Sequence, residues 1–189
     1  MARLPFVDPA TADPAAAQAL RRIAGERGHA FNVYRMLAHS PGTLERVYAL
    51  ASHLWQESAL GPRLAELAIL RVAQLTGSDY EWARHRPLAA RVGVPDAQVD
   101  ALACWREAPA ERFDARERAA LALVDESTTA VEAGEGTVAA ARAALGERGT
   151  VELLVLAGFY GMVARVLRSL AVDGEPGDTS MPHSDIASG

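Results

Sequence analysis

The sequence predicts an all-α protein. Half of its 189 residues are hydrophobic but only 6% are aromatic, and Ala, Leu and Val dominate among many Arg and Glu residues, which is a helix-forming composition. Between the Pro and Gly residues, apolar positions recur every three or four residues and do not alternate, which favours helices over strands. The length suits one domain, which we expect to span residues 1–172 as a single-domain bundle of about eight helices.

Capping residues, prolines and glycines set the limits of these helices. Asp13 and Asp114 are good N-caps because a carboxylate accepts hydrogen bonds from free backbone amides, and Pro14 fits the first position of a helix. Gly77 and Gly93 follow apolar segments and can end helices. The expected elements, in order, are a helix from 13 to the region 25–28, a connector over 29–40, helices over 41–57, 62–75, 80–92 and 95–105, a helix from 114 to about 131, another that ends at 146, and a long last helix from 150.

The C-terminal residues, 173–189, differ from the rest of the chain. They combine Gly, Pro, Ser and Asp and offer almost nothing to bury. Because burial cannot then offset the entropy cost of ordering the backbone, we expect a disordered tail.

Charge and cysteine content exclude several classes of protein. The net charge is −5 and the basic residues are interleaved with acids, so the chain lacks the basic patch that a nucleic acid or an anionic membrane would need. The single cysteine, Cys104, excludes an intrachain disulfide, and the first residues lack the layout of a signal peptide. The most apolar stretch, 151–172, carries three charged residues and is typical of a core helix. We expect a cytoplasmic protein that binds a small molecule, with no nucleic-acid or membrane partner.

Residues 63–85, RLAELAILRVAQLTGSDYEWARH, are the most informative stretch. An apolar helix with one acid, Glu66, turns there into a polar, aromatic helix start. The stretch resembles the signature of the carboxymuconolactone decarboxylase and alkylhydroperoxidase D superfamily, in which a helix glutamate precedes a Cys-x-x-Cys-x-x-x-His motif with Tyr between the cysteines. Segments 31–44 and 158–172 resemble that superfamily's upstream element and last helix, so the resemblance covers most of 31–172.

The resemblance assigns residues of this chain to a site. Glu66 stands at the family's helix glutamate, Tyr80 at its tyrosine and His85 at its histidine, while Ser78 and Glu81 occupy the two positions that hold cysteine in the peroxidase branch. A two-thiol peroxidase needs thiolate attack on peroxide and then disulfide closure, and Ser and Glu can perform neither step. The resemblance therefore implies a branch without that chemistry.

The remaining side chains suit acid–base catalysis. Glu81 and His85 are four residues apart and share a helical face, and the resemblance brings Glu66 against them. In the family's namesake reaction a carboxylate leaves a carbon conjugated to a lactone carbonyl, and the resulting dienolate is protonated without a metal or an organic cofactor. The implied roles are general acid for His85 and hydrogen-bond donor to the carbonyl oxygen for Tyr80, with Glu66 or Glu81 tuning His85.

A carboxylated substrate also calls for an arginine, which can hold a carboxylate through two hydrogen bonds. The candidates are Arg35, Arg71 and Arg84, and we rank Arg35 in the upstream element first. Ser78 is a further candidate for substrate binding.

Each of these residues also has an ordinary structural interpretation. Glu66 could pair with an arginine, His85 could be a solvated residue of an Arg-rich helix, and Glu81 could be a first-turn acid stabilised by the helix dipole. Outside the motif we assign Trp82, Cys104, Phe159, Tyr160 and Met162 to the core, and because His39 and His53 lack the paired spacing of ligands we predict no metal site.

The sequence thus predicts a cofactor-independent lyase or isomerase acting on a small carboxylated lactone or keto acid. Two alternatives stay open: a thiol-dependent peroxidase relative that uses Cys104 and a partner protein, and a non-catalytic binding or assembly module with a vestigial pocket. The resemblance implies a homo-oligomer, a trimer or hexamer, and the Ala-rich amphipathic helices have more apolar surface than one small domain hides.

Overall fold

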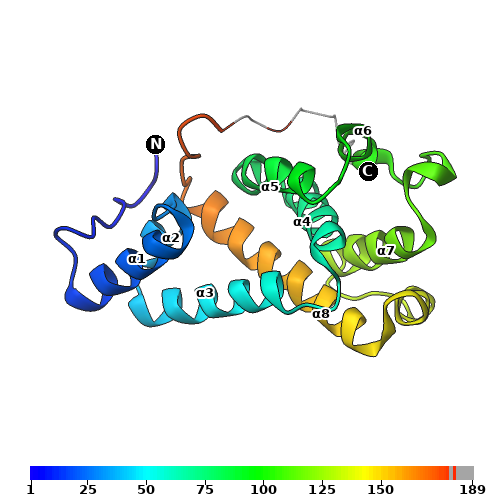
Figure 1. Ribbon diagram of the computed structural model, residues 1–189, viewed down its shortest axis with the longest axis horizontal. Helices are drawn as coiled ribbons and strands as arrows, with labels where there is room; N and C mark the ends of the chain where they lie inside the picture. Colours follow the sequence, from blue (N-terminus) through cyan, green and yellow to red (C-terminus); the bar gives the residue numbers. More distant parts are fainter. Residues whose placement is uncertain (179–180, 182–189) are drawn as a thin grey trace.

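The computed structural model describes residues 1–178 and 181, and its elements are helical (Figure 1). This part of the chain has no strand, which confirms the all-α prediction. The elements are α1 (Pro14–Arg27), α2 (Asn32–Leu37), α3 (Pro41–Gln56), α4 (Pro62–Thr76), α5 (Asp79–Arg91), α6 (Asp96–Asp100), the 3-10 helices η1 (Ala101–Cys104) and η2 (Ala110–Arg112), α7 (Ala115–Thr129) and α8 (Glu135–Ser169).

The capping residues act as the sequence predicts. The Asp13 carboxylate accepts hydrogen bonds from two amides at the start of α1, and Asp114 forms a reciprocal capping box with Glu117 at the start of α7. Gly77 ends α4 in the left-handed conformation with φ 62°. Gly146, with φ 73°, interrupts α8 where the sequence predicts the boundary between two helices. Two elements differ. The expected connector over 29–40 contains the short helix α2, and the expected helix over 95–105 divides into α6 and the 3-10 helix η1.

The core lies where α8 packs against α4 and α7. Leu64, Ile69, Leu123, Leu153 and Leu156 are fully or nearly fully buried there. In Figure 1, α8 runs between α1–α3 on one side and α4, α5 and α7 on the other. By length and composition α8 is apolar enough to cross a membrane, but 56% of its most apolar window is buried inside the protein, as in a core helix.

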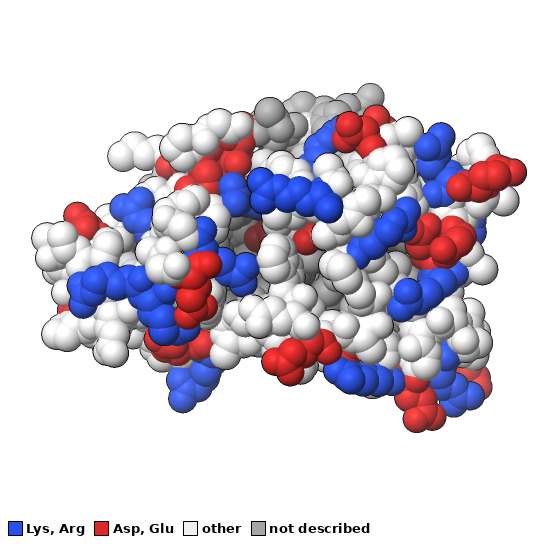
Figure 2. Space-filling view, viewed as in Figure 1, with Lys and Arg blue, Asp and Glu red and all other residues white. Residues whose placement is uncertain are grey.

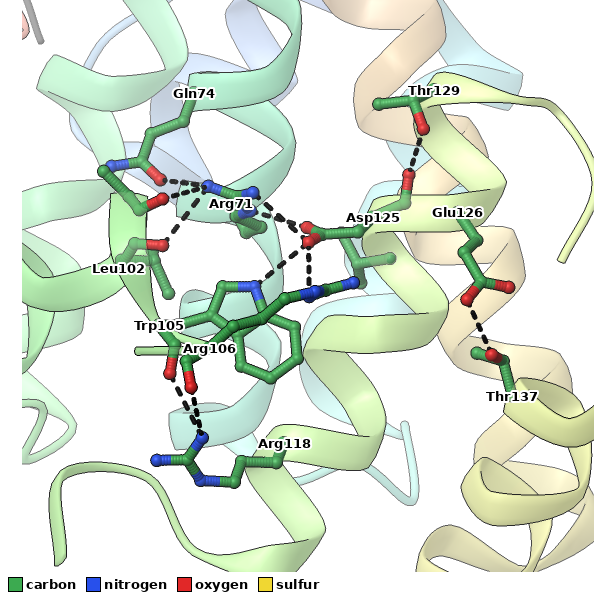
Figure 3. A network of polar contacts seen from close by, with 12 residues as sticks. Arg71, Gln74, Leu102, Trp105, Arg106, Arg118, Asp125, Glu126, Thr129 and Thr137 are labelled. Atoms are coloured by element: carbon green, nitrogen blue, oxygen red, sulfur yellow. Dashed lines mark hydrogen bonds and ion pairs between the residues drawn. The ribbon is translucent and has the colours of Figure 1, made fainter. Parts of the chain in front are cut away.

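A partly buried polar network ties α4 to α7 on the side of α4 that faces η1 (Figure 3). The Arg71 guanidinium donates to both carboxylate oxygens of Asp125, at 2.6 and 3.2 Å, and to the side chain of Gln74. Asp125 also accepts from the Trp105 indole and from Arg106. Arg71, a candidate for substrate binding in the sequence, is thus committed to a structural ion pair.

The structure describes the first residues of the segment after α8, for which the sequence predicts disorder, and shows the contacts that they make. Asp173–Asp178 pass back over α2. There the Glu175 carboxylate accepts hydrogen bonds from the Tyr80 hydroxyl at 2.7 Å and from the backbone amide of Asn32 at 2.6 Å. Asp173 forms an ion pair with the N-terminal ammonium at 3.1 Å. Charge-assisted hydrogen bonds, rather than apolar burial, hold this segment. The hydropathy of the sequence gives no sign of such bonds. Residues 179–180 and 182–189 of the predicted tail lie outside the described residues.

Candidate active site

A cavity of about 510 Å³ lies between helices α1, α2 and α3 on one side and helices α5 and α8 on the other. Figure 2 shows a hollow near the centre of this face, with acidic atoms deep inside it and basic side chains along its edge. Aromatic and aliphatic side chains form most of the wall, which is typical of a small-molecule site. The wall includes Phe31, Val33, Tyr34, Leu37, Val47, Ala51, Trp55, Leu88, Phe159, Tyr160 and Val163, and the ionisable and polar side chains are Glu26, Arg27, His29, Tyr80, Glu81, Arg84, His85 and Arg91.

His85 lies between two buried carboxylates. Its Nδ1 is 2.9 Å from Oε2 of Glu66 on α4, and its Nε2 is 3.3 Å from Oε2 of Glu81, one turn earlier on α5. Glu66 is 3% exposed and His85 7% exposed. His85 and Glu81 line the cavity, whereas Glu66 lies behind them, outside the lining. The structure therefore brings Glu66, Glu81 and His85 together, as the resemblance implied. Glu81 lies at the cavity wall, and Glu66 lies behind it.

The two carboxylates decide the protonation state of His85. Burial by itself lowers the pKa of this imidazole, but the charge and hydrogen bond of Glu66, and then those of Glu81, outweigh burial and raise the pKa to about 9. This pKa favours the imidazolium at neutral pH, which donates a hydrogen bond from Nδ1 to Glu66 and forms an ion pair with Glu81 through Nε2. A buried imidazolium beside a cavity can act as a general acid.

Tyr80 lines the cavity at the start of α5, but its hydroxyl is engaged elsewhere. It donates to Glu175 and accepts a hydrogen bond of 3.3 Å from the Val33 amide. Burial and then the hydrogen bond to Glu175 raise the pKa of Tyr80, so the hydroxyl stays protonated. The predicted role of Tyr80 as donor to a substrate carbonyl thus conflicts with the bond that it makes in this structure.

The structure corrects the prediction for Arg35. Its guanidinium bonds the Val7 carbonyl and the Asn32 side chain and lies over the Phe6 ring, 5.0 Å from the ring centroid, so it supports the N-terminal segment and not the cavity. The arginines of the cavity wall are Arg27, Arg84 and Arg91. Arg84, a weaker candidate in the sequence, stacks on Phe31 with 4.2 Å from its guanidinium carbon to the ring centroid.

Ser78 is the other predicted binding residue that does not reach the cavity. It is 1% exposed, occupies the N-cap position of α5 without a side-chain capping bond, and is absent from the lining. Its hydroxyl has no hydrogen-bond partner within residues 1–178 and 181. Because Ser78 is buried and does not reach the cavity, we assign it a packing role.

Three aromatic residues outside the motif also line the cavity. Tyr160 is buried in the core, as the sequence predicted, and in addition presents its ring edge to His85 with centroids 5.0 Å apart. Tyr34 and Trp55 also line the wall, and Trp55 approaches His85 with ring centroids 6.5 Å apart. Burial raises the pKa of Tyr34 to about 12 and that of Tyr160 well above its usual value. In the sequence, each of these residues is only an aromatic residue in an apolar segment, and such a residue is as well explained by core packing as by a place in a cavity wall.

The remaining assignments divide between core and surface. Trp82 and Phe159 are buried as predicted, whereas Met162 is exposed. Cys104 is exposed, which corrects its prediction as a small buried hydrophobe, and it does not line the cavity. His39 bonds the Pro5 carbonyl and His53 lies one helical turn from its partner Glu57. Within the described part of the chain, no group of three or more His, Cys, Asp or Glu could hold a metal ion.

Comparison with known proteins places this arrangement in context. The model of the carboxymuconolactone decarboxylase family matches residues 41–126, a range that includes Glu66, Tyr80, Glu81 and His85. No curated protein matches the sequence.

Solved structures share the fold at low sequence identity. An uncharacterized peroxidase-related protein with an alkylhydroperoxidase AhpD core from Ralstonia eutropha JMP134 superposes with a TM-score of 0.78 at 17% identity, covering 93% of each chain. An uncharacterized peroxidase-related protein from Silicibacter sp. TM1040 gives a TM-score of 0.77 at 21% identity, covering 93% of this chain and 92% of the other. The debrominase Bmp8, as a cysteine-to-alanine variant in complex with 2,3,4-tribromopyrrole, gives 0.76 at 15% identity, covering 93% and 95%.

Proposed function

We propose that the chain is a member of the carboxymuconolactone decarboxylase-like and AhpD-like superfamily, whose decarboxylase family model matches residues 41–126, and that it is a cofactor-independent acid–base enzyme, a lyase or isomerase. Its substrate is a small carboxylated lactone or keto acid bound in the cavity. One observation carries the proposal: His85 lies at the cavity wall between the buried side chains of Glu66 and Glu81, whose charges raise its pKa. Such an arrangement stores a proton in an apolar pocket, where general acid catalysis needs it.

The proton on Nε2 of His85 is the one that we assign to the reaction. The Nδ1 proton is held by Glu66, which lies outside the cavity lining, whereas Nε2 is shared with Glu81, which lines the cavity. When the substrate carboxylate leaves as carbon dioxide, the bonding electrons enter the conjugated carbonyl and form a dienolate. His85 then protonates the carbon, the carbonyl re-forms, and the neutral imidazole regains a proton from water.

The dienolate needs a hydrogen-bond donor for its oxygen, and Tyr160 suits this role better than Tyr80. The Tyr160 hydroxyl lines the same wall as His85, and in residues 1–178 and 181 it has no hydrogen bond to another protein group. Because its pKa is raised, the hydroxyl keeps its proton and can donate.

Arginines of the cavity wall supply a site for the carboxylate of the substrate. Arg27, Arg84 and Arg91 all line the cavity, and Arg27 lies over the Trp55 ring at 5.0 Å from its centroid. A guanidinium stacked on an aromatic ring keeps a fixed orientation, so little ordering entropy is lost when it binds an anion. These residues take the place of Arg35 in the proposal.

Thiol chemistry is disfavoured by the same geometry. The two motif positions hold Ser78 and Glu81, and the one cysteine, Cys104, is exposed and outside the cavity lining. A peroxidase or reductive dehalogenase mechanism that needs a thiolate at the cavity has no residue to supply it.

We also propose that the chain forms a homo-oligomer, a trimer or hexamer, through the outer face of α8. Val151, Leu154, Val155 and Met162 are exposed on this helix, and Gly158 between them has no atom within 4 Å of the position of a Cβ. This spacing places them along one side of the helix, where a second copy could pack closely. Size-exclusion chromatography with light scattering tests the proposal, and a monomer at micromolar concentration would contradict it.

Carbon dioxide release tests the catalytic proposal. Wild type is incubated with 4-carboxymuconolactone and a panel of keto acids, alongside His85→Ala and Cys104→Ser. We expect turnover in wild type and Cys104→Ser, and its loss in His85→Ala, because only His85 delivers the proton. Loss in Cys104→Ser would favour the thiol-dependent alternative. No turnover of any compound by wild type would favour the non-catalytic binding module.

A further inference from the structure

The segment Asp173–Asp178, which we call the strap, contacts residues of the cavity wall through its own carboxylates. The Glu175 side chain is 9% exposed, and one of its oxygens accepts from both the Tyr80 hydroxyl and the Asn32 amide. The other oxygen is 4.0 Å from Nε2 of His29. The Asp178 carboxylate lies 3.6 Å from the Arg84 guanidinium.

These partners belong to the cavity. His29, Val33, Tyr80 and Arg84 all line it, and the Val33 amide donates to the same Tyr80 hydroxyl that binds Glu175. Tyr80 is 7% exposed, so its hydroxyl is a buried donor aimed at a carboxylate. Together a phenol, a backbone amide, an imidazole and a nearby guanidinium form a set of donors that suits a carboxylate.

The strap has few other attachments. Its backbone contacts with the domain are the Asn32 side-chain bonds to the carbonyls of Asp173 and Gly174, and Asp173 pairs with the exposed N-terminus. Inside the strap, Glu175 and Asp178 bond one another through backbone and side chain. Asp173 also accepts from the Ala2 amide, Asp178 pairs with Arg84, and just beyond the strap the Met181 amide donates to Asp79. Glu175, at 9% exposure, is the most deeply buried of the three strap carboxylates. Another carboxylate that binds the donors of Glu175 can compete with this attachment.

We propose that Tyr80, the Asn32 amide and His29 form a carboxylate-binding subsite at the rim of the cavity, that Glu175 fills this subsite from within the chain, and that an organic acid entering the cavity displaces the strap. The strap thereby acts as an intramolecular competitor that selects for anionic ligands. Release also frees the Tyr80 hydroxyl and Arg84 for the ligand. The proposal deepens the proposed function by locating a substrate subsite, yet it concerns binding alone, so failure of catalysis and failure of the subsite give different results.

Isothermal titration calorimetry with benzoate and its neutral analogue benzamide tests the proposal. In Glu175→Ala the competitor is gone, and because apparent affinity scales with the fraction of protein whose site is open, we expect benzoate to bind about tenfold more tightly than in wild type. Benzamide should bind equally to both proteins. The double variant Tyr80→Phe/Glu175→Ala should lose the gain, and Glu126→Gln, a carboxylate that bonds Thr137 and the Gly134 amide elsewhere, should behave as wild type.

A second measurement uses the wild-type protein alone. Hydrogen–deuterium exchange of peptides that cover the strap should be faster at saturating benzoate than without it, because bound benzoate excludes Glu175. The proposal would be overturned if wild type bound benzoate as tightly as Glu175→Ala or more tightly, or if neither protein bound it. An equal gain in benzamide affinity, or greater protection of the strap with benzoate, would also overturn it.

Discussion

Nδ1 of His85 lies 2.9 Å from the Oε2 of Glu66, and this contact joins α5 to α4 within the interior of the protein. The glutamate is almost fully buried and does not line the cavity, so in the proposed reaction its influence would pass through His85. We therefore propose Glu66 as a positioning residue that orients the ring and favours its charged form. Glu81 completes the arrangement at the other ring nitrogen.

Replacement of Glu66 should move the pH dependence of catalysis. With the pKa of His85 at about 9, the acid form persists to that pH, and kcat should fall above it. Glu66→Gln removes the largest of the influences that raise this pKa, so the alkaline limb should move toward neutral pH and kcat at pH 8 should drop about tenfold or more. The measurement is a kcat profile from pH 6 to 10. An alkaline limb that stays in place would show that Glu66 does not tune the acid.

Protein stability should depend on pH through the same residue. The pKa of His85 is raised from 6.5 to about 9 on folding, so its contribution to stability is fully present below 6.5 and is lost as pH rises through 9. Over this window the free energy of unfolding should fall by up to about 3 kcal/mol. Urea unfolding at pH 6, 7.5 and 9 measures it, with His85→Gln as the reference that lacks the slope. Equal slopes for both proteins would refute this linkage.

Tyr160→Phe should separate catalysis from folding. The variant keeps the buried ring and loses only a hydroxyl beside the cavity that makes no hydrogen bond within residues 1–178 and 181, so its melting temperature should stay close to that of wild type. Loss of a donor to the dienolate oxygen should lower kcat by about 100-fold with little change in KM.

The matched control for Tyr160→Phe is Tyr48→Phe. The Tyr48 hydroxyl donates to Glu26 and accepts from Arg27, and Tyr48 does not line the cavity. This control should keep kcat near the wild-type value. A full kcat in Tyr160→Phe would remove Tyr160 from the mechanism.

The network in Figure 3 should serve stability and not catalysis. Asp125→Ala leaves the largely buried Arg71 guanidinium and the Trp105 indole without their acceptor, which should cost about 3–5 kcal/mol of unfolding free energy. Arg106→Ala removes a half-exposed partner of the same carboxylate and should cost under about 1 kcal/mol. Denaturant unfolding measures both, and similar losses in the two variants would contradict the assignment.

The sequence predicted the helices and the proximity of Glu81 to His85 because the signals for both are local. Asp13 and Asp114 cap helices through neighbouring amides, and the spacing of Glu81 and His85 puts both on one face of α5. The approach of Glu66 is a contact between helices, and it was predicted from the resemblance rather than from spacing.

The rest of the site depends on contacts over long sequence separations, which a single sequence does not encode locally. Arg35 and Arg84 are both arginines near aromatic residues in the sequence. In the structure Arg35 bonds the N-terminal segment and points away from the cavity, whereas Arg84 packs on Phe31 and lines it. Tyr160 looks like a core residue of α8 until that helix is seen to border a cavity. Glu175 lies in a polar segment whose attachment to Tyr80, 95 residues earlier, leaves no trace in hydropathy.

The central claim, that the cavity stores an acidic proton on His85, can be measured directly by NMR. In protein with ¹⁵N-labelled histidine, the ring resonances of His85, assigned by comparison with His85→Gln, are followed from pH 5 to 10. The account predicts an imidazolium at pH 7.5 that titrates near 9. A neutral His85 ring at pH 7.5, with a midpoint at or below 6.5, would contradict it.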